Sequence, residues 1–196
     1  MTVDRRGTAR ALGRVMLLYL LIAFVLCSLA AIADVRRSAI PNALTYPVIG
    51  LAPLLHVART LDAGARPSLA LLQGGYSLIG ILSCAALPYV MWRKRALGGG
   101  DLKLFAALGA LLLPRLSFQV ELYVFAIGAL VVCGQFAYQG RLFAVARDAL
   151  RALLPAPRRA ATGSRKPPTL GANWFRLGPC FAFAVLCHLL MSWKGF

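Results

Sequence analysis

Acidic residues are scarce in this chain of 196 residues, which carries 6 Asp and Glu against 22 Lys and Arg. The formal net charge of +16 would suggest a nucleic-acid partner in a soluble domain. However, 60% of the residues are hydrophobic, and the basic residues cluster between the apolar runs. Basic clusters of this kind are typical of the loops of membrane proteins. We therefore expect a membrane protein that binds lipid and has no nucleic-acid partner.

The sequence also lacks the patterns of several common catalytic sites. It contains no serine nucleophile elbow, no phosphate-binding loop and no metal-protease motif. His56 and His188 lie in separate apolar runs, and we expect each to be packed rather than to bind a metal. Neither a metal nor a cofactor is expected. The cysteines form no Cys-x-x-Cys pair and are expected to act as small apolar residues: they are Cys27, Cys84, Cys133, Cys180 and Cys187.

Long apolar runs predict an all-α fold, a polytopic membrane bundle of about six transmembrane helices that forms a single domain over residues 1–196. Four runs are near the length of about 20 residues that spans a bilayer. Two others are shorter or contain proline, and they could be short, tilted or partly re-entrant helices. The four long runs are 15–33, 69–92, 116–138 and 177–193, and the two uncertain runs are 43–58 and 102–113.

The distribution of basic residues predicts the orientation of the chain. With six crossings, 14 of the 22 Lys and Arg residues share one face with Asp34 and Asp101, which the positive-inside rule assigns to the cytoplasm. The arginines of residues 5–14 oppose this orientation. If only one of the uncertain runs fails to cross, the two aspartates fall on different sides or the later loops invert. Gln119 and Glu121 are expected to be solvated at the opposite membrane interface.

A polar segment, 139–175, is predicted to be a basic cytoplasmic loop. In its first half, 141–154, apolar and basic residues recur at roughly helical spacing, as in helices that lie on an anionic membrane surface. A solvated connector is an equally good interpretation of the segment.

Asp34 and Asp101 have the most informative surroundings of the acidic residues. Asp34 ends the first apolar run, and Asp101 follows three glycines at 98–100. A carboxylate at membrane depth is costly and indicates a functional site. Two carboxylates that share a site can hydrolyse a peptide, one as general base and the other as general acid. Alternatively, the glycines form a plain turn and Asp101 caps the helix that follows.

The motifs around these aspartates, Asp-Val-Arg-Arg-Ser-Ala-Ile-Pro-Asn at 34–42 and Gly-Gly-Gly-Asp-Leu-Lys at 98–103, together resemble those of the type IV prepilin peptidases. These are bacterial aspartic proteases of Gly-x-Gly-Asp type. The resemblance implies that Asp34 and Asp101 are the catalytic pair, located at the cytoplasmic boundary of the inner membrane in a multi-pass protein. The implied substrates are prepilin and pseudopilin precursors, which lose a short basic leader.

Larger members of that family carry an N-terminal insert with paired Cys-x-x-Cys motifs, associated with methylation of the processed pilin. The present sequence lacks such pairs and is most similar to the compact peptidases that serve Flp pili of tight-adherence systems. The resemblance therefore implies a peptidase without methyltransferase activity. The residues expected to bind substrate or to support the aspartates are Arg36, Pro41, Asn42, Gly98, Gly100 and Lys103.

These supporting residues have specific expected roles. The glycines let the backbone pass close to an extended substrate. Pro41 and Asn42 set the turn into the next helix, where Asn42 is expected to be the cap rather than an active-site hydrogen-bond partner. Lys103 contacts an acidic residue of the precursor, or it simply extends toward the membrane surface.

Two alternative functions remain open at this stage. A transporter, or a degenerate peptidase homologue, could use the carboxylates to bind an ion. An intramembrane protease that cuts within transmembrane helices is disfavoured, because its Tyr-Asp motif is replaced here by Ala-Asp. The oligomeric state is not predicted.

Overall fold

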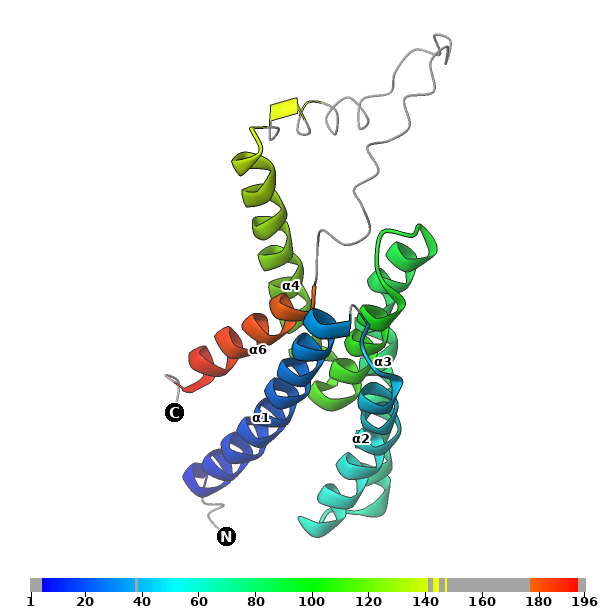
Figure 1. Ribbon diagram of the computed structural model, residues 1–196. Coiled ribbons are helices and arrows are strands. Elements are labelled where there is room, and N and C mark those ends of the chain that lie inside the picture. Colours follow the sequence, from blue (N-terminus) through cyan, green and yellow to red (C-terminus); the bar gives the residue numbers. More distant parts are fainter. Residues whose placement is uncertain (1–4, 38, 141–142, 145–146, 148–176, 194–196) are drawn as a thin grey trace, which may run out of the picture. The chain divides into compact units, whose positions relative to one another are not determined.

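A computed structural model describes residues 5–37, 39–140, 143–144, 147 and 177–193, with side chains from residue 15 onward. Most of the predicted basic loop at 139–175 lies outside these residues. The described residues form helices and contain no strand, which confirms the all-helical class. The helices are α1 (Arg5–Arg37), α2 (Asn42–Asp62), α3 (Pro67–Arg93), α4 (Gly99–Tyr138) and α6 (Gly178–Trp193), as labelled in Figure 1.

The chain divides into two compact units. The larger unit combines Met1–Val124 with Arg176–Phe196, and the smaller unit is Phe125–Phe175, into which α4 continues. Within the larger unit α1 packs against α6, and α2 packs against α3 (Figure 1). The first and last helices are therefore neighbours, and the larger unit contains all the predicted site residues.

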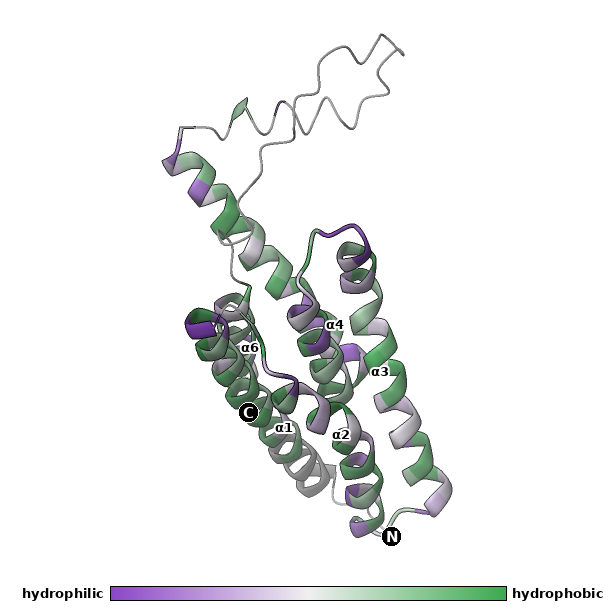
Figure 2. Cartoon of the chain, turned by 45° about the vertical axis from the view of Figure 1, so that its right-hand side comes forward, coloured by the Kyte–Doolittle hydropathy of each residue, from purple (hydrophilic) through white to green (hydrophobic). Residues whose placement is uncertain are grey.

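Among the described residues, three helices are long and apolar enough to cross a membrane, at Val15–Arg37, Pro67–Arg93 and Gly99–Tyr138. The surface of α3 is consistent with a lipid environment, because small residues such as Gly74 and Ser77 are buried whereas Leu71 and Leu82 are exposed. Figure 2 shows that hydrophobic residues predominate on the helices. Packing through small residues, with large apolar side chains facing outward, is typical of membrane helices. The described chain is thus a helical membrane protein, while six crossings remain a prediction.

Helix α4 is broken at Leu113, where φ is 62° and ψ is 166°, just before Pro114. The break separates a first arm (99–112) from a second arm (114–138), so the prediction of two separate helical runs in this region is confirmed. The first arm is the core of the larger unit, since Leu104, Phe105 and Leu108 are at most 1% exposed. A helix enclosed by protein in this way does not need the length that lipid would demand.

Side chains from α2 and α3 compensate for the break in α4. Pro114 has no N–H to bond to the carbonyl of Ala110. The break also leaves the carbonyl of Leu111 without its helical hydrogen bond. The Ser77 hydroxyl donates to the Ala110 carbonyl at 2.7 Å, and His56 Nε2 donates to the Leu111 carbonyl at 3.2 Å. The prediction that His56 is a packed histidine is confirmed, and its partner is a backbone carbonyl.

The first arm of α4 crosses α3 at a contact between glycines. A β-carbon on Gly80 would overlap the backbone of Gly109, and a β-carbon on Gly109 would overlap the backbone of Gly80. Only residues without a side chain allow two helices to approach so closely. The crossing fixes the axial position of the first arm relative to α3. It therefore also fixes where the amino-terminal end of the arm lies.

The environment of Glu121 differs from the prediction. Glu121 is only 2% exposed, beside the Cys84 thiol of α3, whereas the neighbouring Gln119 is exposed. The expectation of interface solvation was wrong for Glu121 because one face of the second arm packs on α3. The cysteines match their prediction as free, mostly buried apolar residues, with Cys133 exposed.

Candidate active site

The structure brings Asp34 and Asp101 together from two helix ends. Asp34 lies in the last turn of α1, three residues before Arg37, and Asp101 lies in the first turn of α4. Both side chains are partly exposed. The two carboxyl groups are close enough for their charges to interact. The arrangement therefore provides two partly exposed carboxylates within electrostatic range of one another.

The three glycines position Asp101 through the backbone. Helix α4 begins at Gly99, and the backbone N–H of the preceding Gly98 donates to the Asp101 carboxylate. A side chain at the third helical position that accepts from the N-cap N–H is half of a capping box. Asp101 thus caps its helix and also lies within electrostatic range of Asp34, so the capping interpretation and the catalytic interpretation are compatible.

Gly100 joins the two sequence motifs. A β-carbon at position 100 would lie 3.1 Å from Ile40 Cβ and 3.4 Å from the Ile40 backbone nitrogen. Ile40 is buried in the connection between α1 and α2, six residues after Asp34. The space left by the missing side chain of Gly100 is therefore filled by this connection. Gly98 lies close to Asp101, because a β-carbon at position 98 would be 3.0 Å from Asp101 Oδ2.

Lys103 and Asn42 contact one another instead of acting separately. Lys103 Nζ donates to Asn42 Oδ1 at 2.7 Å and lies 5.1 Å from the ring centroid of Tyr46. The expectation that Asn42 caps α2 was wrong. Pro41 occupies the N-cap position in an extended conformation, with no side-chain cap bond, and Asn42 is the first helical residue. Pro41 does lie in the turn into α2, as predicted.

The aspartate end of the larger unit is rich in basic residues. Arg36 lies in the last turn of α1, two residues beyond Asp34, and is exposed. The end of α3 and the turn after it carry exposed Arg93, Lys94 and Arg95, and the turn is strongly hydrophilic in Figure 2. These cations lie within a few residues of Asp34 or of the glycines that precede Asp101 in the chain.

Helix α6 also lies at the site, although no motif in the sequence predicts a role for it. A β-carbon at Gly178, in its first turn, would lie 2.9 Å from Asp34 Oδ2. Cys180, two residues later, is close enough to Asp101 for an electrostatic interaction. The available signal was a Gly-Pro pair at the start of the last apolar run, which marks a helix start but not its neighbour.

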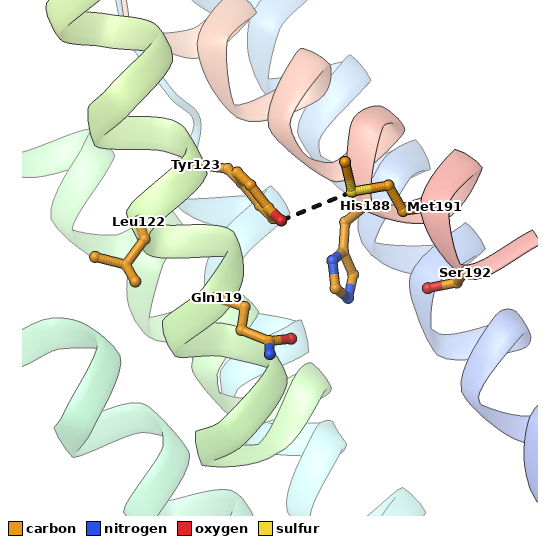
Figure 3. Close-up of a pocket in the computed structure, with 6 residues that line it drawn as sticks. All are labelled: Gln119, Leu122, Tyr123, His188, Met191 and Ser192. Atoms are coloured by element: carbon orange, nitrogen blue, oxygen red, sulfur yellow. Dashed lines mark hydrogen bonds between the residues drawn. The ribbon is translucent and has the colours of Figure 1, made fainter. Parts of the chain in front are cut away.

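A separate cavity of about 380 Å³ lies between the second arm of α4 and the end of α6 (Figure 3). His188, ten residues after Gly178, lies about 15 Å further along α6 at the usual helical rise. The cavity therefore belongs to another region than the aspartates. His188 is buried, as predicted. The lining residues are Gln119, Leu122, Tyr123, His188, Met191 and Ser192.

Comparison with known proteins identifies the family. Residues 20–133, more than half of the chain, match the type IV leader peptidase family. The chain belongs to this family. The matched region contains Asp34, Asp101 and the six predicted supporting residues, whereas α6 lies outside it.

A curated relative of this family member is prepilin peptidase EppA from Methanothermobacter thermautotrophicus. The two are 43% identical over 96 residues, which are 49% of this chain and 24% of the relative. The chain therefore spans about a quarter of the length of that protein. No solved structure matches the chain at a significant level.

Proposed function

We propose that this chain is an aspartic endopeptidase that removes the short basic leader from prepilin or pseudopilin precursors. The observation that carries the proposal is the proximity of the Asp34 and Asp101 carboxyl groups, each at a helix end in the larger unit. Membership of the leader peptidase family and the name of its relative support the choice of substrate.

The pair has the groups that peptide hydrolysis requires. One aspartate, ionised, takes a proton from a water molecule, whose oxygen attacks the carbonyl carbon of the scissile bond. The other aspartate, protonated, donates to the carbonyl oxygen as it gains negative charge. The C–N bond then breaks as the leaving amine takes a proton from one aspartate, while a hydroxyl of the tetrahedral intermediate returns a proton to the other, so the two carboxyl groups again share one proton. No metal or cofactor takes part in these steps.

The basic residues around the site support a cytoplasmic location at the inner membrane in a multi-pass protein. Arg36, Lys94 and Lys103 lie on the elements that meet at the aspartate end of the larger unit. Cytoplasmic loops of membrane proteins carry an excess of such residues. A site at this boundary would meet a basic leader on the cytoplasmic side of the membrane, where the positive-inside rule retains it.

We further propose that the substrates belong to the Flp type and that the chain does not methylate the processed pilin. Both statements rest on the resemblance to the compact peptidases, which lack the paired Cys-x-x-Cys motifs that are also absent from this sequence. Transfer of a methyl group from S-adenosylmethionine to processed pilin by the purified protein would contradict the second statement.

The test is incubation of the purified, lipid-reconstituted protein with an Flp prepilin, followed by mass spectrometry of the products. We expect a single cut that releases the basic leader, and no cut when the leader junction is scrambled. Absence of cleavage by protein that is folded and monodisperse would contradict the proposal and favour an ion-binding role for the two carboxylates.

A further inference from the structure

We propose that Gly178 is a positioning residue that holds Asp34 at its working distance from Asp101, through the first turn of α6. The inference rests on the proposed peptidase function and adds a third element to its site. It concerns a helix outside the segment that matches the family, and it starts from a steric observation.

The contact between Gly178 and α1 leaves no space for a side chain. A β-carbon at position 178 would lie 2.9 Å from Asp34 Oδ2, 3.0 Å from Asp34 Cβ and 3.1 Å from Ala31 Cα. The last of these atoms belongs to the backbone and cannot rotate away. A side chain at 178 would therefore displace the Asp34 carboxylate or push α6 away from α1.

The same turn of α6 reaches the second aspartate. Cys180 is 5% exposed and lies within electrostatic range of Asp101. Phe181 is fully buried and packs edge-to-face on Phe105 of α4, with ring centroids 4.5 Å apart. Phe105 lies one helical turn after Asp101. The first turn of α6 thus contacts α1 at one aspartate and α4 next to the other.

The start of α6 is also well defined. The N–H groups of Cys180 and Phe181 both donate to the Leu177 carbonyl, at 2.9 Å and 3.2 Å, and Pro179 restricts the backbone between them. A rigid turn that contacts both acid-bearing helices sets their separation. Gly178 permits this contact with Asp34, and it acts through position rather than by touching the substrate.

The test compares Gly178→Ala with Gly75→Ala. Gly75 is also a helical glycine, but a β-carbon there would meet nothing within 4 Å. For Gly178→Ala we expect kcat for leader cleavage to fall about tenfold to hundredfold, as for a displaced catalytic group, with KM within about twofold of wild type. The pH profile of kcat should also move. Gly75→Ala should overlay the wild type in every respect.

A second readout does not depend on activity. A hydrophobic carbodiimide modifies membrane carboxyl groups, and mass spectrometry reports the rate of modification at Asp34. We expect this rate to change in Gly178→Ala and to stay unchanged in Gly75→Ala. A wild-type protein that cleaves no precursor would contradict the proposed function, but the Asp34 rates would still decide the role of Gly178.

Unchanged kcat, pH profile and Asp34 modification in folded Gly178→Ala would overturn the inference. If that variant does not fold, Phe181→Leu loosens the same turn at its contact with Phe105. For Phe181→Leu we expect smaller changes in kcat, in the pH profile and in the rate of Asp34 modification. If all three are the same as in the wild type, the inference is overturned.

Discussion

Both ends of the first arm of α4 carry polar contacts in an apolar bundle. At one end the backbone positions a side chain, and at the other end side chains satisfy the backbone. At the start of the arm, the Gly98 backbone holds a side chain, the Asp101 carboxylate, beside a second carboxylate. At its end, the side chains of Ser77 and His56 bond to backbone carbonyls that the break at Leu113 leaves without helical partners.

The comparison distinguishes a pair of carboxyl groups that can take part in a reaction from hydrogen bonds that only stabilise the fold. A hydrogen bond to a freed carbonyl satisfies a buried polar group and needs no further explanation. Two carboxyl groups placed together repel when both are charged, so the arrangement does not stabilise the fold. Such a pair is a functional-site candidate on physical grounds. The first arm of α4 thus has two different ends: a chemical end at Asp101, and a structural end at the break near Leu113.

The largest expected effect comes from removing either carboxylate. Asp34→Asn or Asp101→Asn should lower the rate of leader cleavage by about a hundredfold to ten-thousandfold, because the remaining acid cannot serve as both acid and base. The rate is measured by mass spectrometry of the leader. Asp62→Asn is the matched control, since Asp62 is exposed at the far end of α2. Wild-type activity of Asp34→Asn or Asp101→Asn would show that cleavage does not require both carboxylates.

A smaller loss is expected at the joint between the two motifs. In Gly100→Ala the new methyl group meets Ile40 Cβ at 3.1 Å, so the connection after α1 must shift. We expect kcat to fall about tenfold because Asp101 is misplaced. Gly50→Ala adds a methyl group that meets nothing within 4 Å and should be silent in the same assay. Equal activity of the two variants would show that the joint does not control the site.

Ser77→Ala tests the structural end of the arm. The variant leaves the Ala110 carbonyl without its donor and should lower the free energy of unfolding by about 1 kcal/mol, a common value for membrane helices. Unfolding is followed in mixed micelles. Ser83→Ala, which loses a bond to Gly80 within its own helix, should cost less. Cleavage per folded molecule should remain unchanged in Ser77→Ala, and its loss would contradict the division between the two ends.

The smallest expected effect concerns Lys103 at the rim of the site. If its ammonium contacts a carboxylate of the precursor, Lys103→Met should raise KM about twofold to fivefold, as for an exposed ion pair, and leave kcat unchanged. Steady-state kinetics at two salt concentrations measure the change. A fall in kcat with constant KM would assign Lys103 instead to holding α2 through Asn42.

Local patterns predicted the chemical end better than its surroundings. The motifs singled out Asp34 and Asp101, which lie within electrostatic range of one another, and the separate apolar runs 102–113 and 116–138 match the two arms of α4 on either side of Leu113. Predictions that depend on one helix facing another were less successful. Asn42 was expected to cap α2, but its amide accepts from Lys103, 61 residues further along the chain.

The remaining features could not be read from the sequence because they depend on how helices are paired. Ser77 and His56 reach the freed carbonyls of Ala110 and Leu111 only when α3 and α2 pack against α4 in one particular axial register. Glu121 is buried because its face of the second arm meets Cys84. Gly178 lies beside Asp34 because α6 packs on α1, the helix furthest from it in sequence.

The most direct test of the central claim, that Asp34 and Asp101 form one site, is an infrared titration of the Asp101 carboxyl group. Its band is assigned by comparison with Asp101→Asn and then followed in Asp34→Asn and in the control Asp62→Asn. We predict that the titration midpoint of Asp101 moves in Asp34→Asn, because a neighbouring charge is removed, and stays constant in Asp62→Asn. Coincident curves for wild type and Asp34→Asn would contradict the claim.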